Sequence, residues 1–253
     1  MKRITIIFIS LFALFFLNNC ASDSPSNDSI PSQNTSGQGG SLARFCIANN
    51  YLYVVDNATL HIYSLAEPDH PENVGSINLG IGIETIFYYE DFLYIGSTNG
   101  MIIYSIANPR QPAKTGVYSH VTSCDPVVVQ GDIAYVTLRT GNRCNLGVNL
   151  LDVVDVSNKS NPKPIRSINM QNPWGLGVDG KHLFVCDQAN FIVYFDLTDP
   201  ANPVRIKTFS IKAFDVIPSN NVLLTTGADG ITQYDYSNAP TSLDLLSKIE
   251  IGK

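Results

Sequence analysis

Short runs of hydrophobic residues recur along the chain from residue 43 onward, separated by polar residues, glycine and proline. The runs are rich in Val, Ile, Tyr and Phe, which is typical of β-strands. The first four are ARFCIA, LYVVD, LHIYSL and NVGSINL. No segment keeps an apolar period of 3.6 residues between helix caps, so we expect almost no helix.

These runs form a repeat of about 41 residues. The second run of each unit is YLYVVD, FLYIGS, IAYVTL, HLFVCD or VLLTTG, which places Leu52, Leu93, Ala134, Leu183 and Leu223 at corresponding positions. Their spacings are 41, 41, 49 and 40 residues. The unit therefore occurs five times, and the third unit carries an insertion.

Four strand-like runs in each of five units predict an all-β protein, a β-propeller with five four-stranded blades of about 41 residues each. Glycines in Thr98–Gly100 and Ala228–Gly230 predict tight hairpins between the second and third strands, because glycine accepts positive φ. We expect the ring to close by packing of the fifth blade against the first.

Three stretches resemble the LVIVD repeat, namely LDVVDVSNKSNP, FDLTDPANP and YSIANPRQP. The resemblance covers essentially residues 43–251 and implies a β-propeller on the bacterial cell envelope, since the family consists of exported lipoproteins. It implies little about activity. The repeat has an acidic position, which is filled by Asp155, Asp196 and Asp235 and by Ser64 and Ser105 in the first two units. We interpret this position as structural, with the side chain accepting a hydrogen bond from a backbone donor at a turn.

The N-terminus has the pattern of a bacterial export signal. Lys2 and Arg3 precede an uncharged apolar run at residues 4–17, which is shorter than the roughly 20 residues of a membrane-spanning helix. The run ends at LNNC, which resembles the lipobox of bacterial lipoproteins and implies lipidation of Cys20, although Asn19 replaces the usual small residue. The alternative is ordinary cleavage just downstream, with Cys20 incidental.

The signal is followed by a segment that is rich in Ser, Asn, Pro and Gly and cannot bury a core. As a flexible tether it would reach roughly 25 Å. We therefore predict a signal peptide at residues 1–19, the lipidated Cys20 with its tether at 20–40, and the propeller at 41–253. The predicted location is the bacterial cell envelope, at the outer membrane, with the lipid as the link to the membrane.

The charge is acidic, which argues against some partners. The formal net charge is −6. Removal of the signal would take away two basic residues and no acidic residue, leaving −8. Because there is no basic patch, we expect no nucleic-acid partner.

Two cysteines, Cys124 and Cys144, flank the first two strands of the third unit. In a propeller both positions fall on the same face of one blade, and an oxidising compartment permits disulfides, so we predict a disulfide between them. It would be worth roughly 3 kcal/mol for a loop of about 20 residues. A metal site would need more ligands than these two cysteines offer. Cys46 and Cys186 fall within strands and are expected to be buried thiols.

The starts of the first strands should ring one mouth of the channel. The repeat places six candidate binding residues there: Arg44, Glu84, Asp125, Trp174, Phe214 and Asp215. Acidic and aromatic groups around a mouth could bind a sugar, a peptide or a cation. The alternative is that Trp174 packs between blades and that the carboxylates are merely solvated. The insertion in the third unit favours a binding face.

Enzyme motifs are lacking: the sequence has no G-x-S-x-G, H-E-x-x-H, phosphate loop or C-x-x-C. The predicted function is therefore a membrane-tethered module that binds a protein, peptide or glycan, with no catalytic residues, no metal site and no cofactor. The alternative is a metal-assisted propeller hydrolase acting on an extracytoplasmic small molecule or glycan. It would use Glu84, Asp125 and Asp215 around a bound Ca²⁺, which requires that these carboxylates converge.

Overall fold

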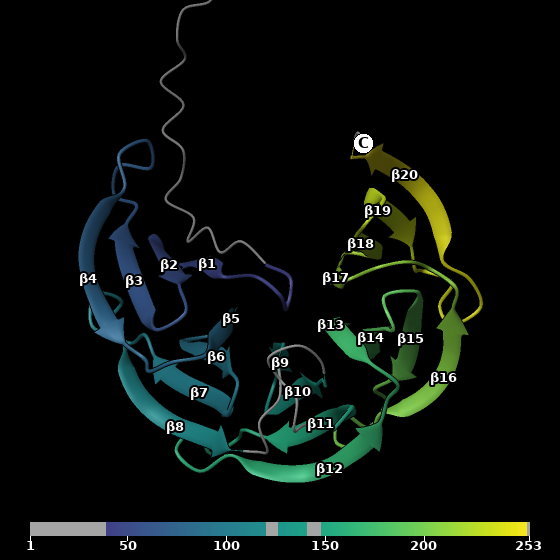
Figure 1. Ribbon diagram of the computed structural model, residues 1–253, viewed down its shortest axis with the longest axis horizontal. Coiled ribbons are helices and arrows are strands. Elements are labelled where there is room, and N and C mark those ends of the chain that lie inside the picture. The colour runs from purple at the N-terminus through teal and green to yellow at the C-terminus, as the bar shows by residue number, and fades with distance from the viewer. Residues whose placement is uncertain (1–38, 120–125, 141–147, 252–253) are drawn as a thin grey trace, which may run out of the picture. The chain divides into compact units, whose positions relative to one another are not determined.

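The computed structural model describes residues 39–119, 126–140 and 148–251. They form five four-stranded antiparallel sheets arranged around a common axis (Figure 1). We call the sheets blades 1 to 5 in chain order. The described residues contain no helix, and so none that could cross a membrane. The predicted all-β fold of five four-stranded blades is confirmed.

Each blade uses four consecutive strands, so no strand is exchanged between blades in the described part of the chain. Blade 1 contains β1 (Phe45–Ala48), β2 (Tyr51–Val55), β3 (Thr59–Ser64) and β4 (Glu72–Asn78). Blade 2 contains β5 (Ile83–Tyr89), β6 (Phe92–Ser97), β7 (Gly100–Ser105) and β8 (Ala113–Ser119). Blade 3 contains β9 (Val127–Gln130), β10 (Ile133–Leu138), β11 (Leu150–Asp155) and β12 (Lys163–Asn169). Blade 4 contains β13 (Pro173–Asp179), β14 (His182–Asp187), β15 (Phe191–Asp196) and β16 (Val204–Phe209). Blade 5 contains β17 (Asp215–Ser219), β18 (Val222–Gly227), β19 (Gly230–Asp235) and β20 (Asp244–Glu250).

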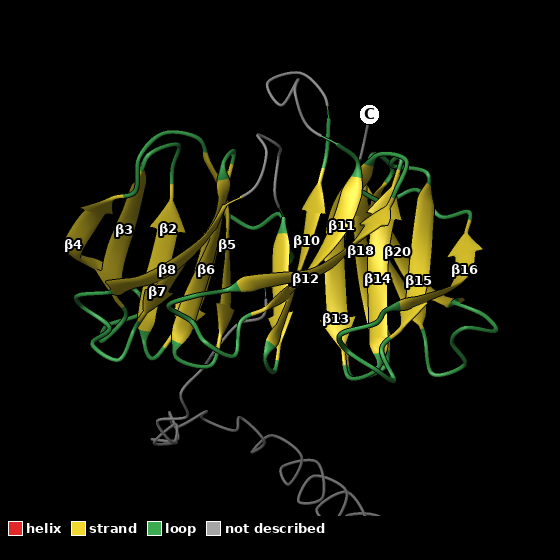
Figure 2. Cartoon of the chain, turned by 90° about the horizontal axis from the view of Figure 1, so that it is seen from below, coloured by secondary structure: helices red, strands yellow, loops and turns green. Residues whose placement is uncertain are grey.

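The first strand of each blade lies nearest the axis and the fourth lies outermost (Figure 1). The strands run between two ends of the ring (Figure 2). Because neighbouring strands are antiparallel, the first strands begin at the end that also carries the hairpins between second and third strands. We call this the upper end, and we call the opposite end, where the first strands turn into the second, the lower end.

The turns at the lower end explain part of the sequence pattern. Asn49 and Asn50 have φ of 51° and 63°, and Asn220 and Asn221 have φ of 51° and 64°. Two consecutive positive φ angles define a type I′ turn, whose twist matches that of the flanking strands. Asparagine tolerates this region because its short polar side chain can hydrogen-bond locally. The turns therefore fix the register of the first two strands.

The repeated acidic position is structural, as predicted. The carboxylates of Asp155, Asp196 and Asp235 accept hydrogen bonds from the backbone N–H two residues later, at 2.8, 2.6 and 2.7 Å. Ser64 and Ser105 accept from the equivalent N–H groups at 3.3 Å. Side-chain and backbone hydrogen bonds from Ser157 and Thr198 lower the pKa of Asp155 and Asp196, and backbone and side-chain hydrogen bonds from Ser237 lower the pKa of Asp235. Each side chain thus satisfies a backbone donor where the third strand ends.

The packing between blades includes a repeated hydrogen bond that the sequence pattern did not reveal. The hydroxyl of Tyr53 in blade 1 donates to the carbonyl of Pro109 in blade 2, at 2.9 Å. The hydroxyl of Tyr135 in blade 3 donates to the carbonyl of Pro200 in blade 4, also at 2.9 Å. Each bond joins the second strand of one blade to the proline-containing loop of the next. The loops thus receive a partly buried polar contact as well as apolar packing.

Burial shows that the two terminal blades each leave one face uncovered. Leu93, Ala134, Leu183 and Leu223 are fully buried on the face toward the preceding blade, whereas Leu52 in blade 1 is only half-buried. Tyr53, Tyr94, Tyr135 and Phe184 are fully buried on the face toward the following blade, whereas Leu224 in blade 5 is half-buried. The substantial strand contacts between blades join consecutive blades. The expectation that blade 5 closes the ring by packing against blade 1 is therefore wrong.

A short segment before β1 connects the two terminal blades instead. We call residues 40–43 the strap; it lies near the axis among the first strands (Figure 1). The carbonyl of Ala43 accepts from Ile86 N–H of blade 2 at 2.9 Å, and the hydroxyl of Ser41 accepts from Leu176 N–H of blade 4 at 2.7 Å. Ser41 also donates to Asp215 of blade 5 at 2.9 Å. The strap, which continues into blade 1, is thus hydrogen-bonded to blades 2, 4 and 5 near the axis.

Candidate functional site

Two of the predicted aromatic residues meet at the upper end of the ring. The rings of Trp174 and Phe214 lie 5.3 Å apart between centroids, so blades 4 and 5 bring them together. The guanidinium of Arg139 lies 3.8 Å above the Trp174 ring, a cation–π arrangement. The hydroxyl of Thr137 donates to the Trp174 carbonyl at 2.7 Å. Trp174 is therefore half-buried and packed between blades.

Glu84 lies at the same end, where β5 has an irregularity. The register of β5 against β6 shifts between Ile83 and Thr85, and β13 shifts in the same way around Trp174. Such bulges redirect side chains and are common next to binding sites. Burial lowers the pKa of Arg139, while the negative charge of Glu84 opposes that change. Arg139 was missed in the sequence, where its only distinguishing mark is that it precedes the insertion of the third unit.

Asp215, the third predicted carboxylate, holds the strap. Its two oxygens accept from Ser41 Oγ at 2.9 Å, from Leu42 N–H at 3.0 Å and from Val216 N–H at 3.0 Å. Burial raises its pKa to about 6, and the hydrogen bonds partly offset this rise. Gly40 and Gly175 lack a side chain where a Cβ atom would collide with the carboxylate. This carboxylate is therefore used inside the protein.

The other predicted residues do not contribute to this cluster in the described structure. Arg44 is exposed just before β1. Asp125 lies outside the described residues, as do Cys124, Cys144 and Cys20 with the predicted disulfide and lipidation. Across the described ranges, no group of three or more His, Cys, Asp or Glu side chains could hold a metal ion. The described upper end thus offers an aromatic and cationic cluster in which Glu84 is the acidic member.

A cavity of about 490 Å³ opens at the other end of the ring. It is lined where the first strands of blades 2, 3 and 4 finish, together with residues next to and within β1. The lining residues are Gly39, Cys46, Ile86, Phe87, Tyr88, Tyr89, Glu90, Val129, Gln130, Val178 and Asp179. The described residues thus form a concave site at the lower end, whereas the candidate residues predicted from the sequence lie at the upper end.

Hydrogen bonds make the wall of this cavity rigid. The side-chain amide of Gln130 donates to the Gly180 carbonyl and accepts from the Gly180 N–H, both at 2.8 Å. The hydroxyl of Tyr89 accepts from Gly131 N–H at 2.9 Å. Asp179 accepts a hydrogen bond from the Tyr236 hydroxyl. These bonds join blades 2 to 5 at the lower end, which pre-organises the site.

The chemistry of the cavity is acidic and aromatic. Glu90 and Asp179 contribute carboxylates and Tyr88 a phenol, and the lining contains no lysine or arginine. Burial raises the pKa of Tyr88, and the charges of Asp91 and Glu90 raise it further. The negative potential therefore favours ligands that donate hydrogen bonds or carry positive charge.

The thiol in the cavity wall is not a reactive group. Burial raises the pKa of Cys46 to about 12, so the thiol stays protonated at neutral pH. Cys186 is also a buried free thiol, and burial raises its pKa too. Both predictions of buried thiols are confirmed, and Cys46 supplies apolar volume to the wall.

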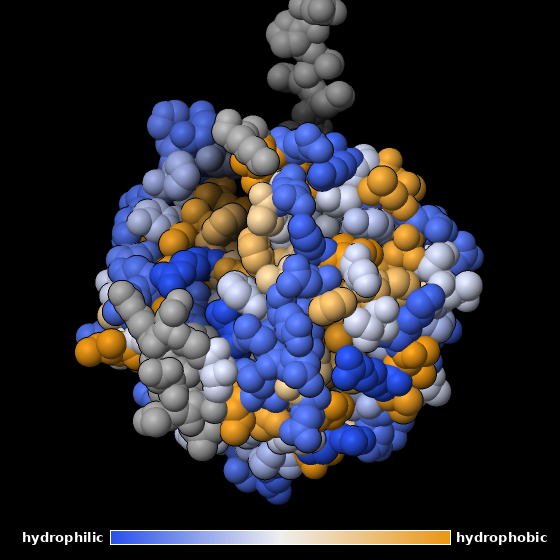
Figure 3. Space-filling view, turned by 45° about the vertical axis from the view of Figure 1, so that its right-hand side comes forward, coloured by the Kyte–Doolittle hydropathy of each residue, from blue (hydrophilic) through white to orange (hydrophobic). Residues whose placement is uncertain are grey.

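A second cavity of about 520 Å³ shares Tyr89 and Gln130 with the first. It extends over Asp132 toward the loop at residues 199–201 of blade 4. On the side seen in Figure 3, hydrophobic residues are scattered among hydrophilic ones, apart from a hollow in which hydrophobic residues gather. The two adjoining cavities give the lower end room for a ligand larger than a single sugar or amino acid.

Comparison with solved structures supports the fold. The chain is similar to a functionally unknown protein from Desulfotomaculum acetoxidans, at 10% identity and TM-score 0.66, covering 80% of this chain and 67% of that one. It is similar to the periplasmic gluconolactonase of Pseudomonas aeruginosa, at 12% identity and TM-score 0.60, with coverage of 81% and 68%. It also resembles Hsv2 of Kluyveromyces lactis, at 13% identity and TM-score 0.51, with coverage of 81% and 61%. At these identities the likeness concerns the fold alone.

Comparison with curated proteins found no match. The LVIVD repeat model matches residues 84–119, 123–169 and 172–210. These ranges correspond to blades 2, 3 and 4, whereas the sequence resemblance was expected to extend over all five units. The protein is thus a β-propeller in which three of the five blades match the LVIVD repeat model.

Proposed function

We propose that this protein is a binding module of the bacterial cell envelope, tethered to a membrane through a lipid on Cys20. Three features of the sequence support this location: the apolar run at residues 4–17, the LNNC motif, and the following segment, which is rich in Ser, Asn, Pro and Gly and cannot bury a core. The match to LVIVD repeats agrees with it, since the resemblance to that repeat implies an exported envelope protein. The gluconolactonase activity of the similar Pseudomonas aeruginosa protein is not carried over, because identity is only 12%.

The lower-end cavity is the proposed ligand site. The observation that carries this assignment is a concave site of about 490 Å³ with rigid walls, two carboxylates and no basic residue in its lining. A ligand with an amine group fits best, because Glu90 and the second oxygen of Asp179 can accept its hydrogen bonds while Tyr88 provides an apolar surface. Amino sugars and cationic side chains of peptides both have this chemistry.

Lipidation gives the first test. Cys20→Ser should move the protein from the membrane fraction to the soluble fraction and should abolish incorporation of labelled fatty acid, because the thiol is the attachment atom. Ser22→Ala is the matched control and should behave as the wild type. A Cys20→Ser protein that stays in the membrane fraction, or that still incorporates label, would show that the anchor lies elsewhere.

Ligand binding gives the second test. Glucosamine should bind the purified protein more tightly than N-acetylglucosamine in calorimetric titration, because acetylation removes the charge and leaves the ring. Glu90→Gln and Asp179→Asn should each weaken glucosamine binding about 3- to 10-fold, the effect of losing about 1 kcal/mol of interaction. Asp69→Asn, an exposed acidic residue outside the lining, is the control. Equal binding of the two sugars, or no binding of glucosamine, would exclude the amine site.

A further inference from the structure

The uncovered face of blade 1 departs from the burial pattern of the other blades. This face consists of Phe45, Ile47, Leu52, Val54, Tyr63 and Leu65, with His61 beside Val54. We call it the back face of blade 1. Its repeat positions are buried elsewhere: Val54 corresponds to Ile95, Val136 and Val185, all 0% exposed, and Leu65 corresponds to Ile106, Val156 and Leu197, all nearly buried. Phe45 is 58% exposed. The side chains of this face are those of an interior, but in the described chain Phe45 is exposed and the others are only half-buried.

The opposite uncovered face, on blade 5, has a different composition. The positions that are Ile62, Ile103, Val153 and Tyr194 in blades 1 to 4 are taken by Gln233 in blade 5. On the same face, Thr226 lies opposite Ile231, which is 38% exposed, and Ile231 lies opposite Ile249, which is 66% exposed. Polar substitution on the outer face of a terminal repeat is how repeat arrays end in water. Blade 5 is therefore only partly capped, whereas the back face of blade 1 keeps the apolar residues of the repeat apart from His61.

The repeat itself indicates what kind of surface the back face of blade 1 accepts. In blades 2 and 4 the back face receives the sheet of the preceding blade, including a tyrosine whose hydroxyl donates to Pro109 or Pro200. Pro68 holds the corresponding loop position in blade 1, 41 residues before Pro109. Pro68 is exposed, and the hydrogen bonds among described residues do not include its carbonyl. Blade 1 thus offers both an apolar sheet face and an exposed acceptor for a tyrosine.

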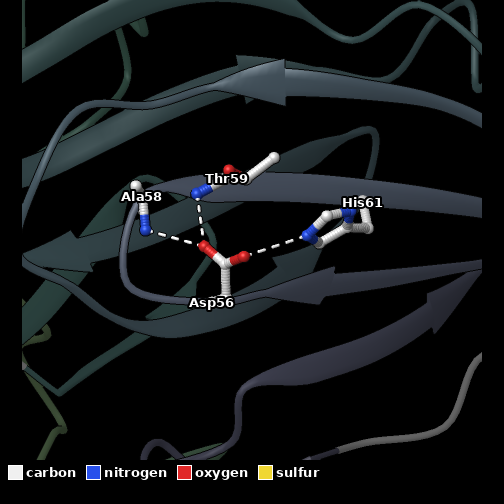
Figure 4. A network of polar contacts seen from close by, with 4 residues as sticks. All are labelled: Asp56, Ala58, Thr59 and His61. Atoms are coloured by element: carbon white, nitrogen blue, oxygen red, sulfur yellow. Dashed lines mark hydrogen bonds and ion pairs between the residues drawn. The ribbon is translucent and has the colours of Figure 1, made fainter.

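The border of this face is acidic. Asp56, at the turn between β2 and β3, accepts from Ala58 N–H and Thr59 N–H at 2.7 Å, and its other oxygen lies 3.0 Å from His61 Nε2 (Figure 4). These contacts hold the pKa of Asp56 well below its usual value. Glu67, Asp69 and Glu72 are exposed on the loop and strand that follow β3. A partner with basic residues around its contact surface complements this border.

We propose that the back face of blade 1 binds a β-sheet of another polypeptide, one that presents aromatic and β-branched side chains, a tyrosine for the Pro68 carbonyl, and lysine or arginine around its edge. Sheets pack face to face about 10 Å apart through such side chains. A second copy of this chain fits less well. Its uncovered sheet on blade 5 has Leu224 in place of the tyrosine and presents Gln233, and its blade 1 would bring a second acidic border against the first.

The experiment places a photo-crosslinking residue at Val54 of the full chain in cells that produce it. Ile206, an exposed apolar residue on the outer strand of blade 4, is the matched control position. We expect adducts from Val54 and none above background from Ile206. Mass spectrometry should map the adduct to a β-strand of the partner. The purified partner is then titrated against the purified full chain, its Phe45→Asp variant and its Ile206→Asp variant.

Phe45→Asp is chosen because this side chain is exposed, so the variant should fold; a cooperative thermal transition checks this. Phe45→Asp should lower the affinity for the partner at least tenfold, whereas Ile206→Asp should bind the partner with the affinity of the wild type. The proposal is overturned if Val54 gives no adduct, if its adducts map to this chain or to lipid, or if they match those from Ile206. It is also overturned if Phe45→Asp binds the purified partner with unchanged affinity.

Discussion

Asp215→Ala is expected to lower the free energy of unfolding by about 3 to 4 kcal/mol, the cost of leaving two or three buried donors without an acceptor. The donors are the Ser41 hydroxyl and the N–H groups of Leu42 and Val216. Urea unfolding of the purified protein measures the change. Because Ser41 and Asp215 belong to one network, Ser41→Ala should add little to Asp215→Ala. A loss below about 1 kcal/mol would show that the strap contributes little to stability.

The same carboxyl group makes stability depend on pH in an unusual direction. Burial raises its pKa to about 6 in the folded protein, above the ordinary value of 3.8. Its contribution to stability is therefore complete below pH 3.8 and is lost as the pH rises through 6. From pH 4 to pH 8 the free energy of unfolding of the wild type should fall by about 2 kcal/mol more than that of Asp215→Asn, which cannot ionise. Identical pH profiles of the two proteins would contradict this assignment.

Leu93→Ala should destabilise the protein by about 2 to 5 kcal/mol, whereas Leu52→Ala should cost no more than about 1 kcal/mol. Both residues occupy the same position in the repeat, but Leu93 is fully buried against blade 1 and Leu52 faces the uncovered side. The pair therefore controls for residue type, strand and local backbone. The difference between the urea midpoints of the two variants measures how much packing against a preceding blade contributes to stability.

Equal losses from the two substitutions would mean that the back face of blade 1 is covered in the protein as purified. Partner binding offers a further check on the same pair. If a partner covers Leu52, its addition should stabilise the wild type more than Leu52→Ala, because a ligand that binds the folded state adds its binding free energy.

Much of the architecture could be predicted from the sequence because it is local. The spacing of Leu52, Leu93, Ala134, Leu183 and Leu223 gave the number of blades, and the acidic position gave a turn contact that the structure confirms at Asp155, Asp196 and Asp235. Such features depend on strand period and on contacts two residues apart. They are therefore visible without knowledge of how the blades meet.

The features that failed to emerge are non-local. The bond between Ser41 and Asp215 spans 174 residues, and no repeat encodes it. How far five blades extend around the axis depends on the angle between neighbouring blades. That angle is set by the side chains packed between them, and the length of the repeat carries no information about it. The position of Arg139 over Trp174, and of a cavity at the lower end, likewise depends on three or more blades at once. Of the predicted mouth residues, Trp174 and Phe214 form an aromatic pair and Asp215 is a structural carboxylate. Glu84 acts electrostatically on Arg139, Arg44 is exposed, and Asp125 lies outside the described residues.

The strap has a mechanical consequence. It follows directly in the chain on the segment proposed to carry the lipid anchor, so a pull between membrane and propeller would be transmitted first to its hydrogen bonds. These bonds lie at Ser41, Leu42 and Ala43 and engage blades 2, 4 and 5 together. The force would therefore be distributed over three sheets before any β-strand separated from its neighbour. The part of the molecule that joins the two terminal blades is also the part that would bear tension.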